Sequence, residues 1–301
     1  MLNIWQTIFL ALLQGFTELF PISSLGHTVI LPGLLPWLFG SNSNNIENNQ
    51  AFLPIIVALH LGTSIALVIY FWRDWFQVLR TLVKSIKEGE VHRGTEEWVS
   101  WLIIIGCIPA GLLGVFLEDP LKKLFAFPLI ASTFLIVNGS LLFFGEALRR
   151  RAEGDLANLP PKEREAKFRP LASLTWKEAI IVGFAQSLAL IPGISRSGST
   201  MVAGLGVRLN HEDAAHYSFL LGTPLIGAAA LLEVPQLIGQ TANTLLLVGL
   251  GAVLAGVAAF LSTKFLMKYF ETGRLTPFAI YCWAAGLVSL ILFIFVFHSG
   301  R

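Results

Sequence analysis

The sequence predicts an all-α polytopic membrane protein, and three observations support this fold class. First, 54% of the 301 residues are hydrophobic and only 13% are charged, whereas soluble globular proteins carry about 25% charged residues. Second, several apolar runs reach the roughly 20 residues that a helix needs to cross a bilayer. Third, each half of the chain begins with an apolar segment interrupted by Pro, Gly and Ser, which is typical of re-entrant helical hairpins.

About six runs are long and apolar enough to form full transmembrane helices. These runs are 52–72, 98–117, 127–148, 217–234, 245–265 and 277–297. Trp72 and Trp98 lie at the ends of two of them, as interfacial aromatic residues do.

Basic residues gather in two groups that predict the orientation of these spans. The first group lies in a loop and contains Arg73, Arg80, Lys84, Lys87 and Arg93. The second lies at 149–172, a charged and proline-containing linker. Two spans separate the groups, so both lie on one side, which the positive-inside rule makes cytoplasmic. The net charge of +2 is too small to indicate a nucleic-acid partner.

The linker divides the chain into two similar halves, a first membrane repeat at 1–148 and a second at 173–301. The segment 14–28 aligns without gaps to 186–200, so that Gln14 matches Gln186 and Ser23 matches Ser195. We expect re-entrant hairpins at about 8–38 and about 175–206, each followed by three spans. They enter from opposite faces and meet near the midplane, as in an inverted repeat. Chance similarity of two Ser/Gly-rich segments is the alternative.

Two charged residues inside these motifs require an explanation. Glu18 ends an apolar helix, where burying a carboxylate without a partner costs several kcal/mol. Arg196 lies among hydroxyl residues at the expected start of a helix, and its guanidinium suits phosphate oxygens. Charges inside a membrane are functional by default, although a purely structural ion pair between Glu18 and Arg196 is the alternative.

The polar residues of the two motifs divide by the chemistry that they offer. The candidate catalytic residues are Gln14, Glu18, Ser24 and His27. The candidate phosphate-binding residues are Arg196, Ser195, Ser197, Thr200 and Gly193. This set predicts hydrolysis of a phosphate ester or anhydride, with His27, Ser24 or a water as nucleophile and Glu18 as the orienting group or base.

The motifs also carry a family resemblance. Gln-Gly-Phe-Thr-Glu-Leu-Phe-Pro-Ile-Ser-Ser-Leu-Gly-His at 14–27 and Pro-Gly-Ile-Ser-Arg-Ser-Gly-Ser-Thr at 192–200 closely resemble the two signature motifs of the undecaprenyl-diphosphate phosphatase family, also called bacitracin-resistance proteins. The resemblance covers essentially the whole chain. It implies hydrolysis of a polyprenyl diphosphate lipid, undecaprenyl diphosphate, in the bacterial cytoplasmic (inner) membrane. That reaction recycles the carrier lipid for cell-wall synthesis and confers bacitracin resistance.

The resemblance also implies roles for single residues. The family's acidic pair falls on Gln14 and Glu18, its motif serine and histidine on Ser24 and His27, and its phosphate-binding arginine on Arg196. A site that opens to the outer side of the membrane is implied as well. The resemblance also implies a divalent cation, Mg²⁺ or Ca²⁺. Because the sequence has no cage of carboxylates, phosphate oxygens would supply most of the ligands of this cation.

Two departures from the family pattern and two wider questions stay open. Gln14 stands where the family often has glutamate, and His60 stands where relatives often have glutamine. His60 is either a buried hydrogen-bonded residue or a site residue. A lipid-carrier flippase or an anion transporter would use the same midplane site, and the sequence also leaves a homodimer open.

Overall fold

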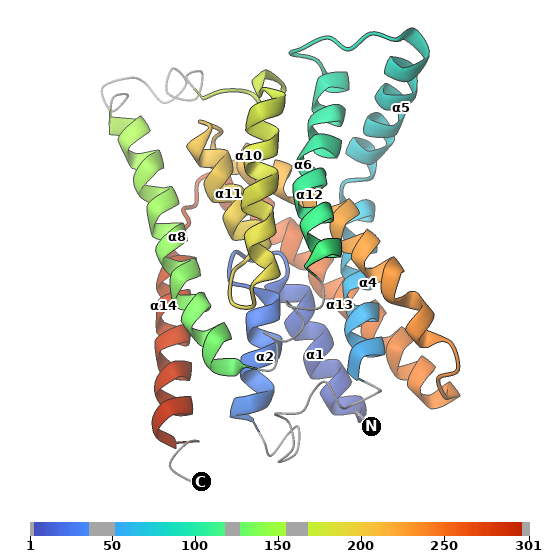
Figure 1. Ribbon diagram of the computed structural model, residues 1–301, viewed down its shortest axis with the longest axis vertical. Helices are drawn as coiled ribbons and strands as arrows, with labels where there is room; N and C mark the ends of the chain where they lie inside the picture. The colour runs from blue at the N-terminus through green and yellow to red at the C-terminus, as the bar shows by residue number, and fades with distance from the viewer. Residues whose placement is uncertain (1–2, 36–51, 118–126, 155–167, 297–301) are drawn as a thin grey trace.

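Every regular element in the described part of the chain is a helix, as Figure 1 shows. The computed structural model describes residues 3–35, 52–117, 127–154 and 168–296. Within these residues, five helical segments are long and apolar enough to cross a membrane: α6 (Glu96–Phe116), α8 (Pro128–Gly154), α12 (His211–Glu233), α13 (Ala242–Phe270), and α14 (Thr276–Ile291) together with the π-helical turn that continues it to Phe295. The remaining expected span falls on α4 (Phe52–Tyr70), of which the part Ala58–Tyr70 is a shorter apolar helix. The predicted all-α polytopic fold is confirmed.

Two helical hairpins approach each other from opposite ends of the bundle (Figure 1). The first consists of α1 (Ile4–Thr17) and α2 (Ser24–Leu34), and it begins four residues before the predicted position. The second consists of α10 (Trp176–Ser187), the short 3-10 helix η3 (Leu188–Leu190) and α11 (Arg196–Gly206). Residues 36–38 of the first predicted hairpin lie outside the described residues.

The two hairpins begin their second helices with the same cap. The Ser23 hydroxyl accepts a hydrogen bond from the Gly26 amide at 3.1 Å, and the Ser195 hydroxyl accepts one from the Gly198 amide at 3.1 Å. These residues correspond in the ungapped alignment of the motifs. Each serine satisfies an amide that the first helical turn leaves without a partner. The repeat seen in the sequence is therefore also a repeat in hydrogen bonding.

Each hairpin packs against a span of the other half. Helix α1 packs on α13 and α10 packs on α6, while α4 contacts α12 and α8 contacts α14. A Cβ on Gly15 would overlap the Ala255 carbonyl, and one on Gly183 would overlap the Gly106 carbonyl. Small residues at these crossings let the helix backbones approach closely. The position of each hairpin tip is therefore set by spans from the opposite half.

The expected loop around the first basic group is wrong for residues 72–88, which form helix α5 (Trp72–Glu88). Basic side chains such as Arg80 and Lys84 are exposed on it, and so are the apolar residues Phe76, Leu79 and Val83. A helix with both kinds of exposed residue suits a membrane–water boundary. The sequence did not indicate it as a span because its charges exceed those that a bilayer core tolerates.

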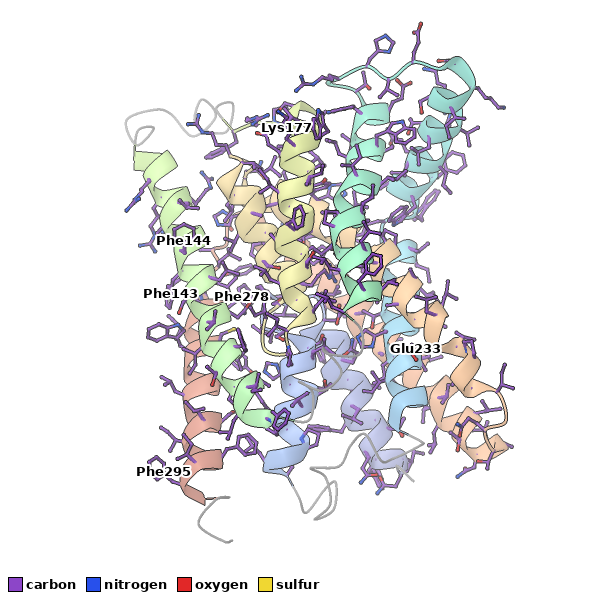
Figure 2. All side chains as sticks on the ribbon, in the orientation of Figure 1. Phe143, Phe144, Lys177, Glu233, Phe278 and Phe295 are labelled. Carbon is purple, nitrogen blue, oxygen red and sulfur yellow. The ribbon has the colours of Figure 1, made fainter. Side chains whose placement is uncertain are left out.

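The described surface carries exposed apolar side chains along the sides of the bundle, which suit lipid, and charged side chains at one end, which suit water. Phe144 and Phe295 are 57% and 69% exposed and stand on the outside of the bundle (Figure 2). Lys177 lies at the end that also carries α5 and the C-terminal end of α8 (Figures 1 and 2). Helix α8 continues to Gly154, and residues 155–167 of the expected linker lie outside the described residues. The domain boundaries stay a prediction.

Candidate active site

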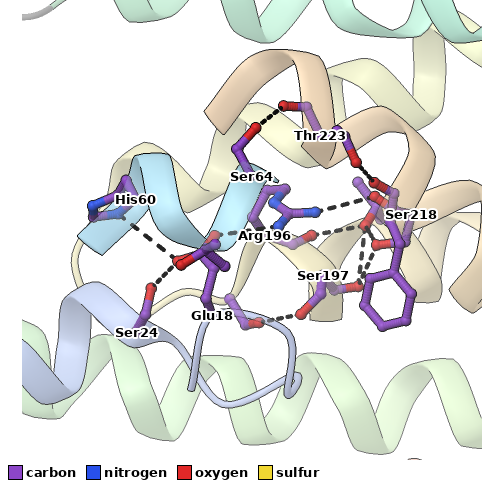
Figure 3. Close-up of polar contacts among 12 residues, drawn as sticks. Glu18, Ser24, His60, Ser64, Arg196, Ser197, Ser218 and Thr223 are labelled. Carbon is purple, nitrogen blue, oxygen red and sulfur yellow. Dashed lines mark hydrogen bonds and ion pairs between the residues drawn. The ribbon is translucent and has the colours of Figure 1, made fainter. Parts of the chain in front are cut away.

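An ion pair joins the tips of the two hairpins. Arg196 Nη2 donates to Glu18 Oε1 at 3.2 Å, and both side chains are only 8% exposed (Figure 3). Arg196 Nη1 donates to the Ser218 carbonyl of α12 at 3.1 Å. Two guanidinium N–H groups are thus used within the described residues, which leaves others for an incoming anion. The structure brings these two charges, 178 residues apart in sequence, into direct contact.

The second oxygen of the Glu18 carboxylate accepts two further hydrogen bonds. Ser24 Oγ donates to Oε2 at 2.5 Å and Gln14 Nε2 donates to it at 3.0 Å. Gln14 lies one helical turn before Glu18 and therefore on the same face of the chain. Ser24 is the first residue of α2. A hydroxyl that donates to a buried carboxylate is an arrangement in which the carboxylate is able to activate an oxygen nucleophile.

Two helix N-termini point into this site, because α2 begins at Ser24 and α11 begins at Arg196. Each N-terminus carries roughly half a positive charge and unpaired amide groups. The first helix of each hairpin ends at the same tips, α1 at Thr17 and α10 at Ser187, so the helix dipoles give the site no net charge. What the two N-termini supply is backbone amide donors, which suit phosphate and other anions.

The hydroxyl groups around Arg196 donate hydrogen bonds to backbone carbonyls, and none of these bonds involves the guanidinium. Ser195 Oγ and Ser197 Oγ donate to the Phe20 carbonyl at 3.3 and 3.2 Å. Thr200 Oγ1 donates to the Arg196 carbonyl at 2.8 Å. These bonds tie the second tip to the first and fix the start of α11. A phosphate-binding role for the three hydroxyls stays a prediction.

Gly193 and Asn138 set the shape of the tips. Gly193 has a φ of 102° and a Cβ there would overlap the Ala131 carbonyl of α8, so the turn requires glycine. Asn138, also on α8, donates to the Pro21 carbonyl at 3.0 Å and accepts from the Ser195 amide at 2.9 Å. One amide side chain therefore holds a tip residue from each hairpin. The sequence motifs did not indicate Asn138, because it lies in an apolar span.

Both ring nitrogens of His27 have hydrogen-bond partners. Its Nδ1 lies 2.7 Å from the Ser23 carbonyl and its Nε2 lies 2.7 Å from the Tyr281 hydroxyl of α14. Both ring nitrogens are therefore engaged away from the Glu18 carboxylate. A catalytic role for His27 stays a prediction.

The histidine that faces the Glu18 carboxylate is His60 of α4. Its Nε2 lies 3.9 Å from Glu18 Oε2 (Figure 3). The sequence left this residue open between a buried structural role and a place at the site. The structure places it beside the carboxylate.

The family model for the bacitracin resistance protein BacA matches residues 7–288. The chain belongs to the BacA family. The undecaprenyl-diphosphatase of Mycolicibacterium paratuberculosis is 42% identical over 298 residues, which cover 95% of this chain and 96% of the relative. The undecaprenyl-diphosphatase of Acidiphilium cryptum is 43% identical over 291 residues, covering 95% and 96%. Undecaprenyl-diphosphatase 2 of Burkholderia thailandensis is 44% identical over 298 residues, covering 98% of both chains.

The donor set of this BacA family chain does not fit a metal ion held by protein side chains alone. In the described part of the chain, no three His, Cys, Asp or Glu residues form a cluster that would hold one. Both oxygens of Glu18 already accept hydrogen bonds, and Arg196 adds a competing positive charge. Gln14 Oε1 is buried without a hydrogen-bond partner among the described residues and offers one neutral oxygen. Hard divalent cations need more oxygen ligands than these.

Proposed function

We propose that this chain hydrolyses undecaprenyl diphosphate to undecaprenyl phosphate and inorganic phosphate. The observation that carries the proposal is the Glu18 carboxylate, which accepts from Ser24 on one oxygen and from Arg196 on the other. This contact lies where two helix N-termini converge. Full-length relatives named undecaprenyl-diphosphatase support the substrate and the reaction.

In this proposal Arg196 and the two helix ends hold the terminal phosphoryl group. The guanidinium carries further N–H groups in a planar fork, which is able to donate to two phosphate oxygens at once. The Ser218 carbonyl fixes the guanidinium on one side and Glu18 fixes it on the other. Arg196 is therefore preorganised for the charge that develops on the phosphoryl oxygens in the transition state.

Ser24 is the proposed nucleophile, because its hydroxyl already donates to the Glu18 carboxylate. Its Oγ forms a bond to the terminal phosphorus, while the bond from that phosphorus to the bridging oxygen breaks. The bonding electrons leave with undecaprenyl phosphate, and the serine proton passes to Glu18. A water then attacks the phosphoserine, which releases inorganic phosphate and restores the serine hydroxyl.

The proposed setting is the bacterial cytoplasmic membrane, with the site open to the outer side and membrane lipids around the spans. The reaction would return the carrier lipid to cell-wall synthesis and protect the cell against bacitracin. A divalent cation, Mg²⁺ or Ca²⁺, stays part of the proposal only as an ion coordinated mainly by the diphosphate oxygens. The homodimer also stays a prediction.

The test is phosphate release by the purified chain in detergent with undecaprenyl diphosphate as substrate. We expect wild type to release inorganic phosphate, and a rapid quench in denaturing detergent at neutral pH, which preserves both phosphoserine and phosphohistidine, to trap phosphoserine that Ser24→Ala lacks. Trapped phosphohistidine that is lost in His27→Ala would instead assign the nucleophile to His27. Lipid translocation in proteoliposomes without any phosphate release would overturn the hydrolase and favour the flippase or anion transporter.

Gly222→Ala is expected to lower kcat/KM for undecaprenyl diphosphate by about 10²-fold, the loss typical of removing one preorganised donor. A Cβ at this position of α12 would overlap the Arg196 guanidinium, so the guanidinium must leave its present position. Initial rates of phosphate release measure the effect.

Gly249→Ala on α13 is the matched control, because a Cβ there meets nothing within 4 Å. Both variants add one methyl group to a helical glycine, so they share any general effect on the helix. Equal activity of the two variants would show that Arg196 does not need its present position.

A further inference from the structure

Ser23, the residue before the proposed nucleophile, has an unusual backbone conformation. Its φ of 68° is one that residues with a side chain rarely adopt, and its ψ of 101° lies outside the left-handed helical region. Ser195, the corresponding cap of the second hairpin, has an ordinary extended backbone with a φ of −85° and a ψ of 127°. The two caps share a hydrogen bond, but the backbone of Ser23 is strained and that of Ser195 is not. Such strain persists only where the surrounding structure holds it, and it is typical of active sites.

The conformation of Ser23 decides where the Ser24 hydroxyl points. The φ and ψ of Ser23 set the direction in which the chain enters α2, and Ser24 is the first residue of that helix. From this position the Ser24 hydroxyl donates to Glu18 Oε2 at 2.5 Å. If Ser23 relaxed to an extended backbone, the entry to α2 would turn and this hydrogen bond would break. Under the proposed function, on which this inference rests, activation of Ser24 therefore depends on its strained neighbour.

His27 holds the Ser23 carbonyl in place. Its Nδ1 lies 2.7 Å from that carbonyl, and because a carbonyl only accepts, Nδ1 carries the hydrogen and donates it. The helical bond from the His27 amide to the same carbonyl is longer, at 3.3 Å. At the place of His27 the second hairpin has Ser199, whose hydroxyl donates to the Arg196 carbonyl and not to that of Ser195. The strained backbone and the imidazole bond therefore occur together in the first tip, and neither occurs in the described tip of the second.

Tyr281 of α14 in turn holds the ring of His27. Once Nδ1 carries the hydrogen of the neutral ring, Nε2 has the lone pair, so the Tyr281 hydroxyl at 2.7 Å donates to it. The two rings are stacked, with 5.7 Å between their centroids and 11° between their planes. Tyr281 thus fixes both the tautomer and the plane of the imidazole. We propose that Tyr281 is a positioning residue for phosphate release, which acts through His27 on the Ser23 carbonyl and so keeps the Ser24 hydroxyl on Glu18.

The first experiment separates the two ring nitrogens of His27. The amide nitrogen of asparagine is two bonds from Cβ, as Nδ1 is, whereas that of glutamine is three bonds from Cβ, as Nε2 is. We expect His27→Asn to keep the bond to Ser23 and a kcat for undecaprenyl diphosphate within about 10-fold of wild type. His27→Gln should lose about 10²-fold in kcat with little change in KM, the loss that a reacting group misplaced by about 1 Å produces. A His27→Asn protein as inactive as His27→Gln would overturn the proposal.

The second experiment removes the strain at Ser23. Glycine adopts a positive φ freely and is tolerated as a helix cap, so Ser23→Gly makes the turn independent of His27. In this background His27→Gln should lose less than about 10-fold in kcat, against about 10²-fold in the wild-type background. A loss of the same size in both backgrounds would show that His27 acts in the chemistry itself, which would overturn the positioning role.

The third experiment tests Tyr281 directly. Tyr281→Phe keeps the stacked ring and removes only the hydroxyl, and it should lower kcat by about 10-fold at an unchanged KM. It should cost nothing further in His27→Asn, which has no atom at the place of Nε2. A wild-type kcat in Tyr281→Phe, a loss confined to KM, or a full further loss in His27→Asn would each overturn the proposal.

Tyr269→Phe on α13 is the matched control, because it also removes one tyrosine hydroxyl, which donates to the Arg274 carbonyl at 2.9 Å. Its kcat and KM should equal those of wild type. Wild type that releases no phosphate would overturn the proposed function itself, which distinguishes that failure from a failure of the positioning role.

Discussion

Glu18→Gln is expected to lower kcat for undecaprenyl diphosphate by about 10³-fold, within the range for a lost general base. The amide keeps the size of the side chain but cannot take the Ser24 proton. It also replaces one of the two acceptor oxygens that now serve Ser24 and Arg196 with an N–H donor. The hydroxyl is then no longer activated, and the guanidinium loses its counter-ion. Initial rates of phosphate release at saturating substrate measure the effect.

Glu233→Gln serves as the control, because it makes the same substitution at the far end of α12, away from the hairpin tips (Figure 2). Its kcat should equal that of wild type. A Glu18→Gln protein that keeps a tenth or more of the wild-type kcat would exclude Glu18 as the base. The phosphate that this variant releases would then have to come from attack by a nucleophile that needs no carboxylate base.

The sequence predicted the fold well because the bilayer makes strong demands on composition. A spanning helix must be apolar over its whole length, so spans can be found without knowledge of their partners. The hairpins were predicted from a repeat whose corresponding residues, Ser23 and Ser195, make the same helix cap. Helix α5 was missed because an amphipathic helix at the boundary carries the charges that a search for spans rejects.

The site was predicted where its residues lie in the motifs and missed where they come from the spans. The inverted repeat was the ground for expecting the motifs of Glu18 and Arg196 to meet near the midplane, and a direct ion pair between them was the alternative hypothesis. By contrast, the roles of Gly222 and Asn138 depend on which face of α12 and α8 turns toward the tips. Apolar periodicity is weak in helices that are apolar all round, so that face cannot be read from the sequence.

For His27 the sequence motif gave the position of the residue but not its hydrogen-bond partners. Its motif spacing to Ser24 places the two residues on one helix, but spacing alone does not say which neighbour each ring nitrogen meets. In the structure, Nδ1 lies at hydrogen-bond distance from the Ser23 carbonyl, and Nε2 lies at hydrogen-bond distance from the hydroxyl of Tyr281, a residue 254 positions away. His60 lies beside Glu18 instead because α4 packs against α1. Only the packing of these helices decides which histidine is near the carboxylate.

A charge-free double variant, Glu18→Gln with Arg196→Met, is expected to fold stably and to lose at least about 10³-fold in phosphate release. Replacing both members of a buried ion pair is often neutral or stabilising, whereas removing one member costs about 3–5 kcal/mol. The single variant Glu18→Gln leaves the Arg196 guanidinium buried with a poor partner, so it should unfold at a lower temperature than the double variant. Thermal unfolding in detergent and phosphate release are measured on the same preparations.

These two readouts separate a structural ion pair from a catalytic one. If the pair only held the hairpin tips together, the double variant would recover activity along with stability, because the tips keep the Asn138 bonds to Pro21 and Ser195. If the pair performs the chemistry, stability returns and activity does not. Recovery of both would reject catalysis by Glu18 and Arg196, even though the relatives are phosphatases. Recovery of stability alone assigns the chemistry to the two charges that the hairpins bring together.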